Sequence, residues 1–332
     1  MKFPDLQNEA VVIQMQKARN KTASLLWLMF RYVLIIGISF IILYPILQQL
    51  SVAFKDKADI YNPTIYMIPV HFTMENVRYA MAVLNYWPLL KNTLLFAAST
   101  TLLQAASCSL AGYGFARFNF PGKNILFTLV VLTILIPSST LMVPMYIHFR
   151  SFDLFGVIHL ITGKDGINML NTYGPSMITA AFANGLKSGL FIYIFRQFFR
   201  GMPGEIEEAA LIDGAGGIRT FFTIMLPNAI PPLITVILFA FVWQYNDIFY
   251  ASLFNSASDL MSIKVSSLPA DVNQYLPGIM GIGSGTNVKV DPNQVSLIVD
   301  TGILLAISPL IAMYLFVQRF FVESVERSGV VG

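Results

Sequence analysis

Two apolar stretches of the chain hold the residues best suited to solute chemistry. Lys187 lies near the middle of one stretch, where an ionisable side chain predicts a solute pathway or a packing partner. A lysine that extends its ammonium group to the membrane interface fits equally well. The other stretch holds Trp243, Gln244, Asn246 and Asp247, and polar groups beside an aromatic ring suit sugar binding. An aromatic belt at the interface is the favoured alternative for Trp243.

Catalytic and metal-binding chemistry has little support in the sequence. His71, His148 and His159 are single and scattered, whereas a metal site needs clustered ligands. Cys108, the one cysteine, lies in an apolar run, which favours a buried small residue over a reactive thiol. The phosphate-binding loop Gly-x4-Gly-Lys-Ser/Thr does not occur. We therefore expect no catalytic residue, no metal and no cofactor in this chain, and we do not expect an enzyme.

The composition predicts that these residues lie in a membrane protein. The 332 residues are 55% hydrophobic and only 12% charged, whereas a soluble domain is about 25% charged. Too few polar side chains are available to cover a soluble surface. This composition excludes a soluble enzyme, a disordered protein and a disulfide scaffold. The net charge of +3 gives no electrostatic support for a nucleic-acid partner.

Long stretches without charge predict an all-α membrane protein with six transmembrane helices. A helix needs about 20 apolar residues to cross the hydrocarbon core, and barrel strands are only about 10 residues long with alternating polarity. The six predicted spans cover residues 25–50, 90–114, 124–148, 176–199, 229–253 and 297–321. Segment 176–199 is the exception in charge, because it contains Lys187 and Arg196.

The distribution of basic residues predicts the orientation. Residues 1–24, the loops 115–123 and 200–228, and the end 322–332 hold more lysine and arginine per residue than the opposite side, which makes them cytoplasmic. The domain organisation is then a cytoplasmic segment 1–24, a transmembrane domain 25–322 and a cytoplasmic tail 323–332. The loops 51–88 and 254–296 lie outside, and we expect the second, which is rich in glycine, to be flexible.

The cytoplasmic loop 202–227 carries the clearest local pattern. Glutamates crowd the first turn of a predicted helix, where the helix dipole favours anions, and Gly214 ends that helix. A second short helix is expected from about Ile218 to Leu226, with Pro227 breaking it before the membrane. The small residues Ala209 and Ala210 would let another protein approach closely. A docking element and a simple interfacial connector remain equally good interpretations.

The same loop resembles a known motif. Glu208-Ala209-Ala210, three residues, Gly214, nine residues and Ile224-Met225-Leu226-Pro227 resemble the EAA loop of ABC importer permeases at every fixed position. The segments 110–122, 244–247, 318–322 and 328–332 resemble the sugar branch of that family, the relatives of the smaller maltose permease subunit. The resemblance covers nearly the whole chain. The charged tail segment 323–326 departs from the usual glycine-rich, uncharged pattern.

This resemblance implies a coupling helix that docks into a cleft of a separate ATPase subunit. The residues carried over to that docking surface are Glu208, Ala209, Ala210, Asp213, Gly214, Ile224, Leu226 and Pro227. The tail residues Gln318, Arg319 and Gly332 are candidates for a further contact with the ATPase.

The resemblance also implies a permease subunit of the bacterial inner membrane that imports a carbohydrate, an oligosaccharide, by alternating access. Its partners would be a second homologous permease, two ABC ATPase subunits that bind ATP and Mg, an extracytoplasmic binding protein and the lipid bilayer. The alternatives are an ABC permease for a non-sugar solute, such as glycerophosphate or a polyamine, and a secondary transporter independent of ATP. A secondary transporter should show internal repeats, and none is convincing here. The sequence does not identify the sugar.

Overall fold

The computed structural model describes residues 6–256, 259–281 and 290–329, with side chains described from residue 20 to residue 319 of these ranges except at position 211. The chain divides into two units, residues 1–76 and 77–332, and each is described by itself. Secondary structure in the described ranges is helical, apart from two isolated bridges, Lys55 with Phe72 and Phe152 with Ile167. This confirms the predicted all-α class.

The first unit consists of one long helix and a short folded loop. Helix α1 runs from Leu6 to Ala53, and α2 covers Lys57–Ile60. The apolar side chains of α1 between residues 25 and 43 are exposed, as expected for a helix that faces lipid or a partner. The loop after α1 is closed by the buried ammonium group of Lys55, which donates to the carbonyl oxygens of Ile65 at 3.2 Å and Tyr66 at 2.8 Å.

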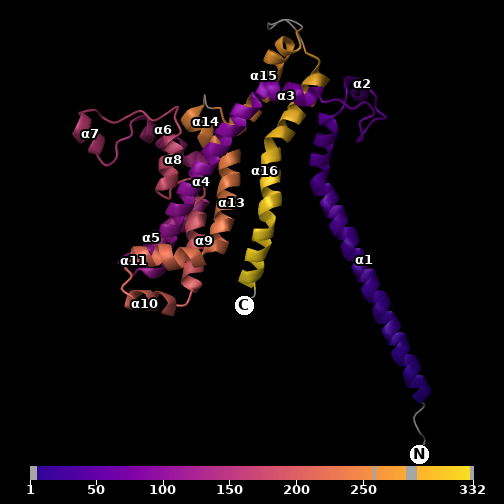
Figure 1. Cartoon of the computed structure of the whole chain (residues 1–332), viewed down its shortest axis with the longest axis horizontal. Helices are drawn as coiled ribbons and strands as arrows, with labels where there is room; N and C mark the ends of the chain where they lie inside the picture. The colour runs from indigo at the N-terminus through magenta and orange to yellow at the C-terminus, as the bar shows by residue number, and fades with distance from the viewer. Residues whose placement is uncertain (1–5, 257–258, 282–289, 330–332) are drawn as a thin grey trace, which may run out of the picture. The chain divides into compact units, whose positions relative to one another are not determined.

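The second unit is organised around α4, Tyr86–Arg117, which packs against α8, Gly174–Ala181, α9, Ser188–Gly201, and α13, Ile230–Asn246 (Figure 1). The contact between α4 and α9 is close, because a Cβ at Gly112 would lie 3.0 Å from the Arg196 amide nitrogen. Small residues permit such approaches between membrane helices.

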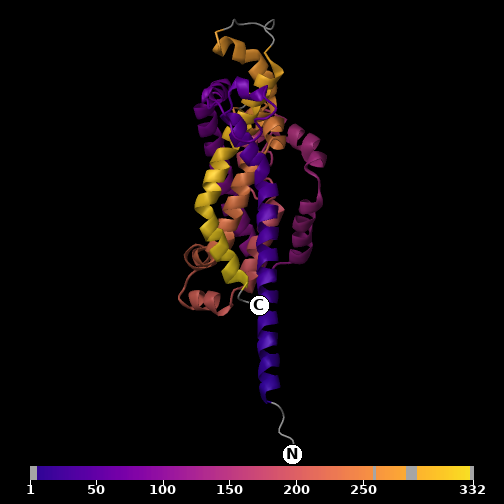
Figure 2. The ribbon, with the colours of Figure 1, turned by 90° about the vertical axis from the view of Figure 1, so that its right-hand side faces the viewer.

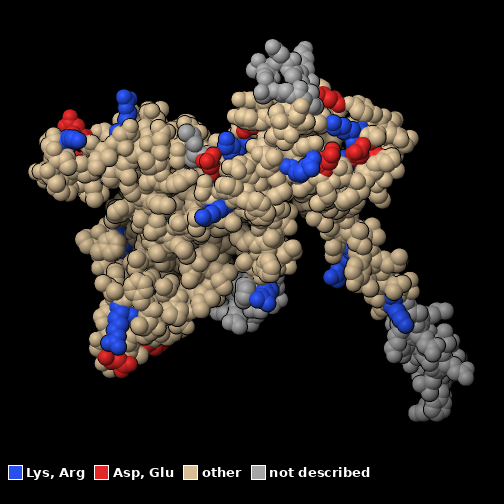
Figure 3. Space-filling view, turned by 45° about the horizontal axis from the view of Figure 1, so that its top comes forward, with Lys and Arg blue, Asp and Glu red and all other residues tan. Residues whose placement is uncertain are grey.

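The second unit contains further helices and turns besides these four. Figure 2 shows the same helices turned by 90°. The elements are α3 Glu75–Leu84, which begins in the first unit, α5 Lys123–Leu135, the 3-10 turn η1 Ser138–Leu141, α6 Met142–Arg150, α7 Val157–Thr162, α10 Glu205–Ile212, α11 Gly217–Thr220, the π-helical turn η2 Phe221–Met225, α12 Leu226–Asn228, α14 Phe249–Asn255, α15 Met261–Ile279 and α16 Pro292–Gly329. Most of the coloured face shown in Figure 3 is free of charged side chains.

The described helices include three that are long and apolar enough to span a membrane: residues 20–53, 86–117 and 292–319. Two bent pairs raise the number to five: α5 with η1 and α6, bent by 106°, and α11 to α12 with α13, bent by 81°. Pro137 precedes η1, and Pro231 and Pro232 begin α13, so missing backbone donors accompany both bends.

The predicted continuous helix over 176–199 is wrong. Residues 182–187 separate α8 from α9, and Ala183 and Lys187 have φ of 55° and 61°. Left-handed conformations are unfavourable for residues other than glycine and interrupt a helix. Lys187 therefore lies at the residue before α9 begins rather than in the middle of a helix.

The expectation of a flexible loop over 254–296 is also wrong for most of its length. Residues 261–279 form α15, and its Leu268, Val272 and Leu276 are completely buried against neighbours that include α16. These residues recur every four positions and so line one face of the helix. The last helix is longer than predicted, because α16 continues through residues 323–329 of the expected tail.

Candidate functional site

Helix α10 carries the first half of the resembling loop, as the sequence predicts. Glu205, Glu207 and Glu208 occupy its first turn, where they complement the helix dipole. Gly214 has φ +79°, and the Ala215 amide donates to the Ala210 carbonyl oxygen at 2.9 Å. The glycine therefore ends the helix in the left-handed conformation that L side chains adopt reluctantly.

The second half of the loop is one helical run in three segments, α11, η2 and α12. It ends at Asn228, and the sharp bend into α13 follows at Ala229. The break was predicted at Pro227, and the structure places it two residues later, at Ala229. Pro227 lies one residue before the end of this run, directly after the π-helical turn η2 and Leu226.

Glu207 anchors α10 to the end of α4. The Tyr113 hydroxyl donates to Glu207 Oε1 at 2.7 Å, and Arg117 Nε lies 3.4 Å from Glu207 Oε2. Arg117 Nη2 also donates to the Met202 carbonyl oxygen at 2.8 Å. These contacts were not predicted from the sequence. The sequence offered one signal, the i, i+4 spacing of Tyr113 and Arg117 at the end of a predicted helix.

The structure divides the candidate docking residues by exposure. Those exposed are Glu208, Ala209, Asp213, Gly214 and Pro227, whereas Ile224 and Leu226 are half-buried. Ala210 is only 3% exposed and faces the interior of the unit. Two apolar residues that the sequence analysis did not select, Ile212 and Ile218, are 86% and 79% exposed beside this surface. Exposed apolar side chains of this size are suited to a protein contact.

A buried polar group fills the gap between α8 and α9. Gln104 of α4 is fully buried, and its Nε2 donates to the Leu186 carbonyl oxygen at 2.6 Å and to Ser188 Oγ at 2.8 Å. Gln244 of α13 donates to Gln104 Oε1 at 3.3 Å. The side chain of Gln104 therefore satisfies the Leu186 carbonyl oxygen, which lies in the break between the two helices. Sequence analysis missed Gln104, because an isolated glutamine in an apolar helix carries no distinctive spacing.

Two neighbouring cavities adjoin this break. The larger has a volume of about 320 Å³, and its lining includes Lys187, Asn184 and Ser138. The smaller, of about 20 Å³, is lined in part by Gln244 and Asp247. Both cavities share the residues Met145, Asn184, Gly185, Leu186 and Tyr250. The fold thus brings three of the five candidate pathway residues, Lys187, Gln244 and Asp247, into one region.

Asp247 also has a local structural role. Its Oδ1 accepts hydrogen bonds from the amides of Phe249 at 3.1 Å and Tyr250 at 3.3 Å. These bonds satisfy donors at the start of α14 in the manner of a helix cap. The carboxylate is therefore held by backbone groups at the edge of the cavity.

The other candidates lie elsewhere. Trp243 is half-buried and stacked between Phe191 and Phe239, with ring centroids 5.6 and 5.7 Å away, so its ring packs against the side of a buried cluster. Asn246 is exposed and donates to the Val242 carbonyl oxygen of its own helix at 2.9 Å. Among the tail candidates, Gln318 and Arg319 are exposed on α16.

The tail candidate Gly332 lies outside the described residues. Within the ranges that the structure describes, no three His, Cys, Asp or Glu side chains come close enough together to hold a metal ion.

Comparison with known proteins agrees with this architecture. Residues 108–327 match the family described as "Binding-protein-dependent transport system inner membrane component". The probable ABC transporter permease protein PH1036 of Pyrococcus horikoshii is 32% identical over 224 residues, which cover 66% of this chain and 73% of that protein. The arabinooligosaccharides transport system permease protein AraQ of Halalkalibacterium halodurans is 26% identical, over 89% of this chain and 93% of that protein.

Two further matches extend the comparison. The sn-glycerol-3-phosphate transport system permease protein UgpE of Yersinia enterocolitica is 27% identical, over 89% of this chain and 94% of that protein. A chain of a bacterial ABC transporter involved in the import of alginate has the same fold, with a TM-score of 0.68 at 20% identity, covering 88% of this chain and 95% of that one. The chain belongs to the family of binding-protein-dependent transport system inner membrane components, the permeases of ABC transporters.

Proposed function

We propose that this permease is one of two homologous membrane subunits of an ATP-driven importer that brings an oligosaccharide into the cytoplasm. Permeases of this family work with ATPase and substrate-binding protein partners. The relatives whose names specify arabinooligosaccharides and diacetylchitobiose support a carbohydrate substrate. The complete importer would contain two ATPase subunits, which bind ATP and Mg, and an extracytoplasmic binding protein.

The observation that carries this proposal is the anchored helix α10. Its exposed surface, with Glu208, Ala209 and Gly214, carries the motif expected to dock into the ATPase, and Glu207 joins the helix to α4. A displacement of α10 by the ATPase would thus reach Tyr113 and Arg117 directly. Since α4 packs on α8, α9 and α13, the displacement passes to the helices around the cavities.

The cavities beside the break between α8 and α9 support a role for this region in binding the solute. Lys187, Asn184 and Ser138 supply polar groups suited to hydroxyl-rich solutes, and the break between α8 and α9 exposes backbone that a continuous helix would conceal. In this proposal the bent spans move between inward-facing and outward-facing states when the ATPases close on ATP. The α10 end of the second unit faces the cytoplasm, and so do both termini.

The proposal is tested with the complete transporter reconstituted in liposomes, with ATP inside and the loaded binding protein outside. Labelled arabinooligosaccharide or diacetylchitobiose should accumulate in the lumen only when ATP is hydrolysed. An ATPase subunit that binds ATP without hydrolysing it is the matched control and should abolish accumulation. Uptake that persists in that control would contradict an ATP-driven importer and favour a secondary transporter.

A second candidate is import of an anionic solute, which the position of Lys187 on the cavity favours. One relative is named for sn-glycerol 3-phosphate. A cation beside a phosphate or carboxylate would contribute a charge-assisted hydrogen bond. If the solute is anionic, Lys187→Met should reduce uptake of labelled sn-glycerol 3-phosphate about tenfold or more, as expected for about 1.5–3 kcal/mol. Equal uptake by the variant and the unmodified chain would reject this candidate.

A further inference from the structure

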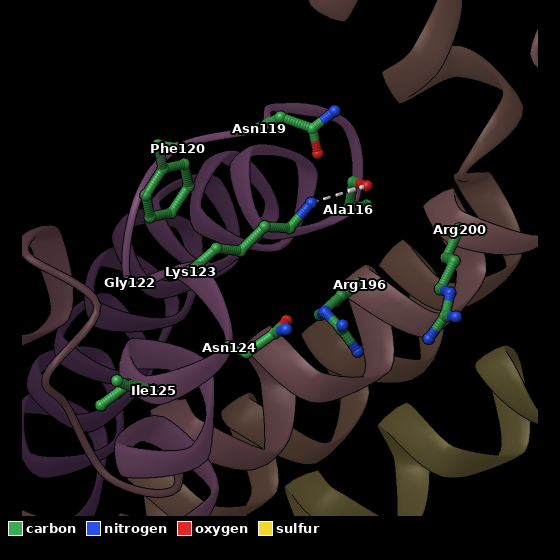
Figure 4. A pocket seen from close by; sticks show the side chains of 9 residues that line it. All are labelled: Ala116, Asn119, Phe120, Gly122, Lys123, Asn124, Ile125, Arg196 and Arg200. Carbon is green, nitrogen blue, oxygen red and sulfur yellow. Dashed lines mark hydrogen bonds between the residues drawn. The ribbon is translucent and has the colours of Figure 1, made fainter.

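A large pocket shares no lining residue with the cavity region or with α10. It has a volume of about 630 Å³ and forms where α4 ends, α5 begins and α9 approaches its end (Figure 4). Its lining residues are Ala116, Asn119, Phe120, Gly122, Lys123, Asn124, Ile125, Arg196 and Arg200. None of these residues belongs to the candidate pathway or docking sets, so the proposed transport function leaves this pocket unexplained.

Three basic side chains surround the pocket, and its lining contains no acidic residue. Figure 4 shows Lys123 on one side of the open space and Arg196 and Arg200 on the other. Like charges at such short range repel each other, so the arrangement is unfavourable until an anion enters. Three cations from two different helices therefore indicate a site for an anionic group rather than an ordinary solvated face.

The contacts of these cations leave most of their donors available. Lys123 Nζ has one long hydrogen bond, 3.4 Å, to the Ala116 carbonyl oxygen. Arg196 Nε lies 3.4 Å from the Phe115 carbonyl oxygen, and its guanidinium lies 3.8 Å from the centre of the Phe127 ring. Stacking on an aromatic face orients a guanidinium and leaves its in-plane N–H groups free to bind. Within the described part of the chain, no carboxylate pairs with any of the three.

The surroundings of the pocket identify the kind of anion. Helix α5 has no buried residue, and one set of its apolar side chains is exposed, including Ile125 at 69% and Leu129 at 52%. Ile125 lines the pocket as well, so the basic site opens directly onto an apolar helix surface. A ligand that matches both features has a phosphate at one end and hydrocarbon at the other. Basic pockets at the ends of membrane helices bind lipid headgroups in this way.

We propose that this pocket binds the phosphate of an anionic phospholipid headgroup, with the acyl chains lying along α5. The guanidinium groups of Arg196 and Arg200 and the ammonium group of Lys123 supply the charge-assisted hydrogen bonds, and the first turn of α5 adds the positive end of its dipole. Free inorganic phosphate would use the same basic groups, but it would make no use of the apolar surface beside them.

The test measures lipid binding to the complete transporter in detergent, by native mass spectrometry, with phosphatidylglycerol and phosphatidylcholine titrated separately. The triple variant Lys123→Gln, Arg196→Gln and Arg200→Gln removes the pocket charges. The control variant Lys91→Gln, Arg150→Gln and Lys164→Gln removes the same charge from exposed positions outside the pocket. The pocket variant should bind phosphatidylglycerol at least about tenfold more weakly, since it loses three basic residues that attract an anionic headgroup.

The unmodified transporter should prefer phosphatidylglycerol to phosphatidylcholine, and the control variant should keep that preference. Phosphatidylglycerol binding that is equal in the pocket and control variants would overturn the proposal. Inorganic phosphate is titrated separately by isothermal calorimetry. Phosphate binding that depends on the three residues, together with unchanged phosphatidylglycerol binding, would identify a free-phosphate site and reject the lipid. Because the readout is binding, these results are independent of which solute is transported.

Discussion

The Tyr113 hydroxyl of α4 donates a 2.7 Å hydrogen bond to Glu207 Oε1 of α10. Tyr113 is only 3% exposed, and its ring contacts Phe199 and Phe221, so the hydroxyl is held in position. The bond joins the central helix of the second unit to the loop that carries the family motif. It is the shortest of the contacts described between α4 and Glu207.

Tyr113→Phe should loosen α10 without preventing folding. The change removes a hydrogen bond to a charged group, which costs about 1.5 kcal/mol or more, while the ring packing stays. We expect amide hydrogen exchange across residues 205–212 to become about tenfold faster. Tyr314→Phe, at an exposed position of α16, is the matched control and should leave exchange unchanged. Equal protection of α10 in the unmodified chain and the Tyr113 variant would contradict the anchoring role.

Gly214→Val should weaken association with the ATPase while leaving membrane insertion intact. A Cβ at Gly214 meets nothing within 4 Å, so the effect comes from the positive φ, at a cost of about 1–2 kcal/mol. The measurement is co-purification of ATPase subunits with the permease. Gly214→Asn is the matched control, because asparagine tolerates the left-handed conformation. Full association of the valine variant would reject a coupling role for this turn.

Gly189→Ala should destabilise the contact between α5 and α9. A Cβ at Gly189 would contact Thr133 and would lie 2.8 Å from the Val130 carbonyl oxygen, so backbone must move. Overpacking of this kind costs about 1–3 kcal/mol and should lower the thermal denaturation midpoint. Gly201→Ala, on the same helix with nothing within 4 Å, should cause no decrease. If the two variants had the same thermal denaturation midpoint, the close approach of these helices would be refuted.

Gln104→Met should destabilise the broken span between α8 and α9. Methionine has a similar size, but it leaves the Leu186 carbonyl oxygen, Ser188 Oγ and the Gln244 amide without the partner that Gln104 supplies. A buried group left unsatisfied costs about 1–3 kcal/mol. The midpoint of thermal denaturation and the rate of solute uptake should both decrease. The control is Gln197→Met at an exposed position of α9, and equal stability of both variants would count against the role of Gln104.

Asp59 should make the loop of the first unit sensitive to acid. Burial opposes its charged form, but hydrogen bonds from the His71 ring and from the amides of His71 and Val70 outweigh burial and lower the pKa of Asp59. Because its pKa is lower in the folded loop, Asp59 stabilises the loop above the ordinary aspartate value. That stability is lost as the pH falls through the folded pKa.

Limited proteolysis of residues 57–73 between pH 7 and pH 3 measures this sensitivity. Asp59→Asn should be cleaved faster at pH 7 and should show a weaker dependence on pH. Asp56→Asn is the control, because asparagine can still accept the hydrogen bond from the Ala58 amide that Asp56 accepts now. Identical cleavage profiles for Asp59→Asn and the unmodified chain would refute the prediction.

Several features of this permease could be predicted because they depend on local sequence. Scarce charge places the chain in a membrane whatever its tertiary structure, since too few polar groups exist to cover a soluble surface. The helix of residues 205–212 and its end at Gly214 follow from acidic residues in the first turn and from glycine's tolerance of positive φ. The motif around Glu208 likewise lies within one short segment.

Tertiary structure decided the features that join distant segments. The break at Lys187 is stabilised by Gln104, 83 positions earlier in the chain, and the anchoring of Glu207 depends on Tyr113, 94 positions earlier. The order of α15 likewise depends on burial of Leu268 against residues of other helices. Hydropathy averages over neighbours along the chain and contains no term for such contacts. The sequence by itself therefore determined the membrane class and the local form of the loop, and only the fold determined which polar groups meet.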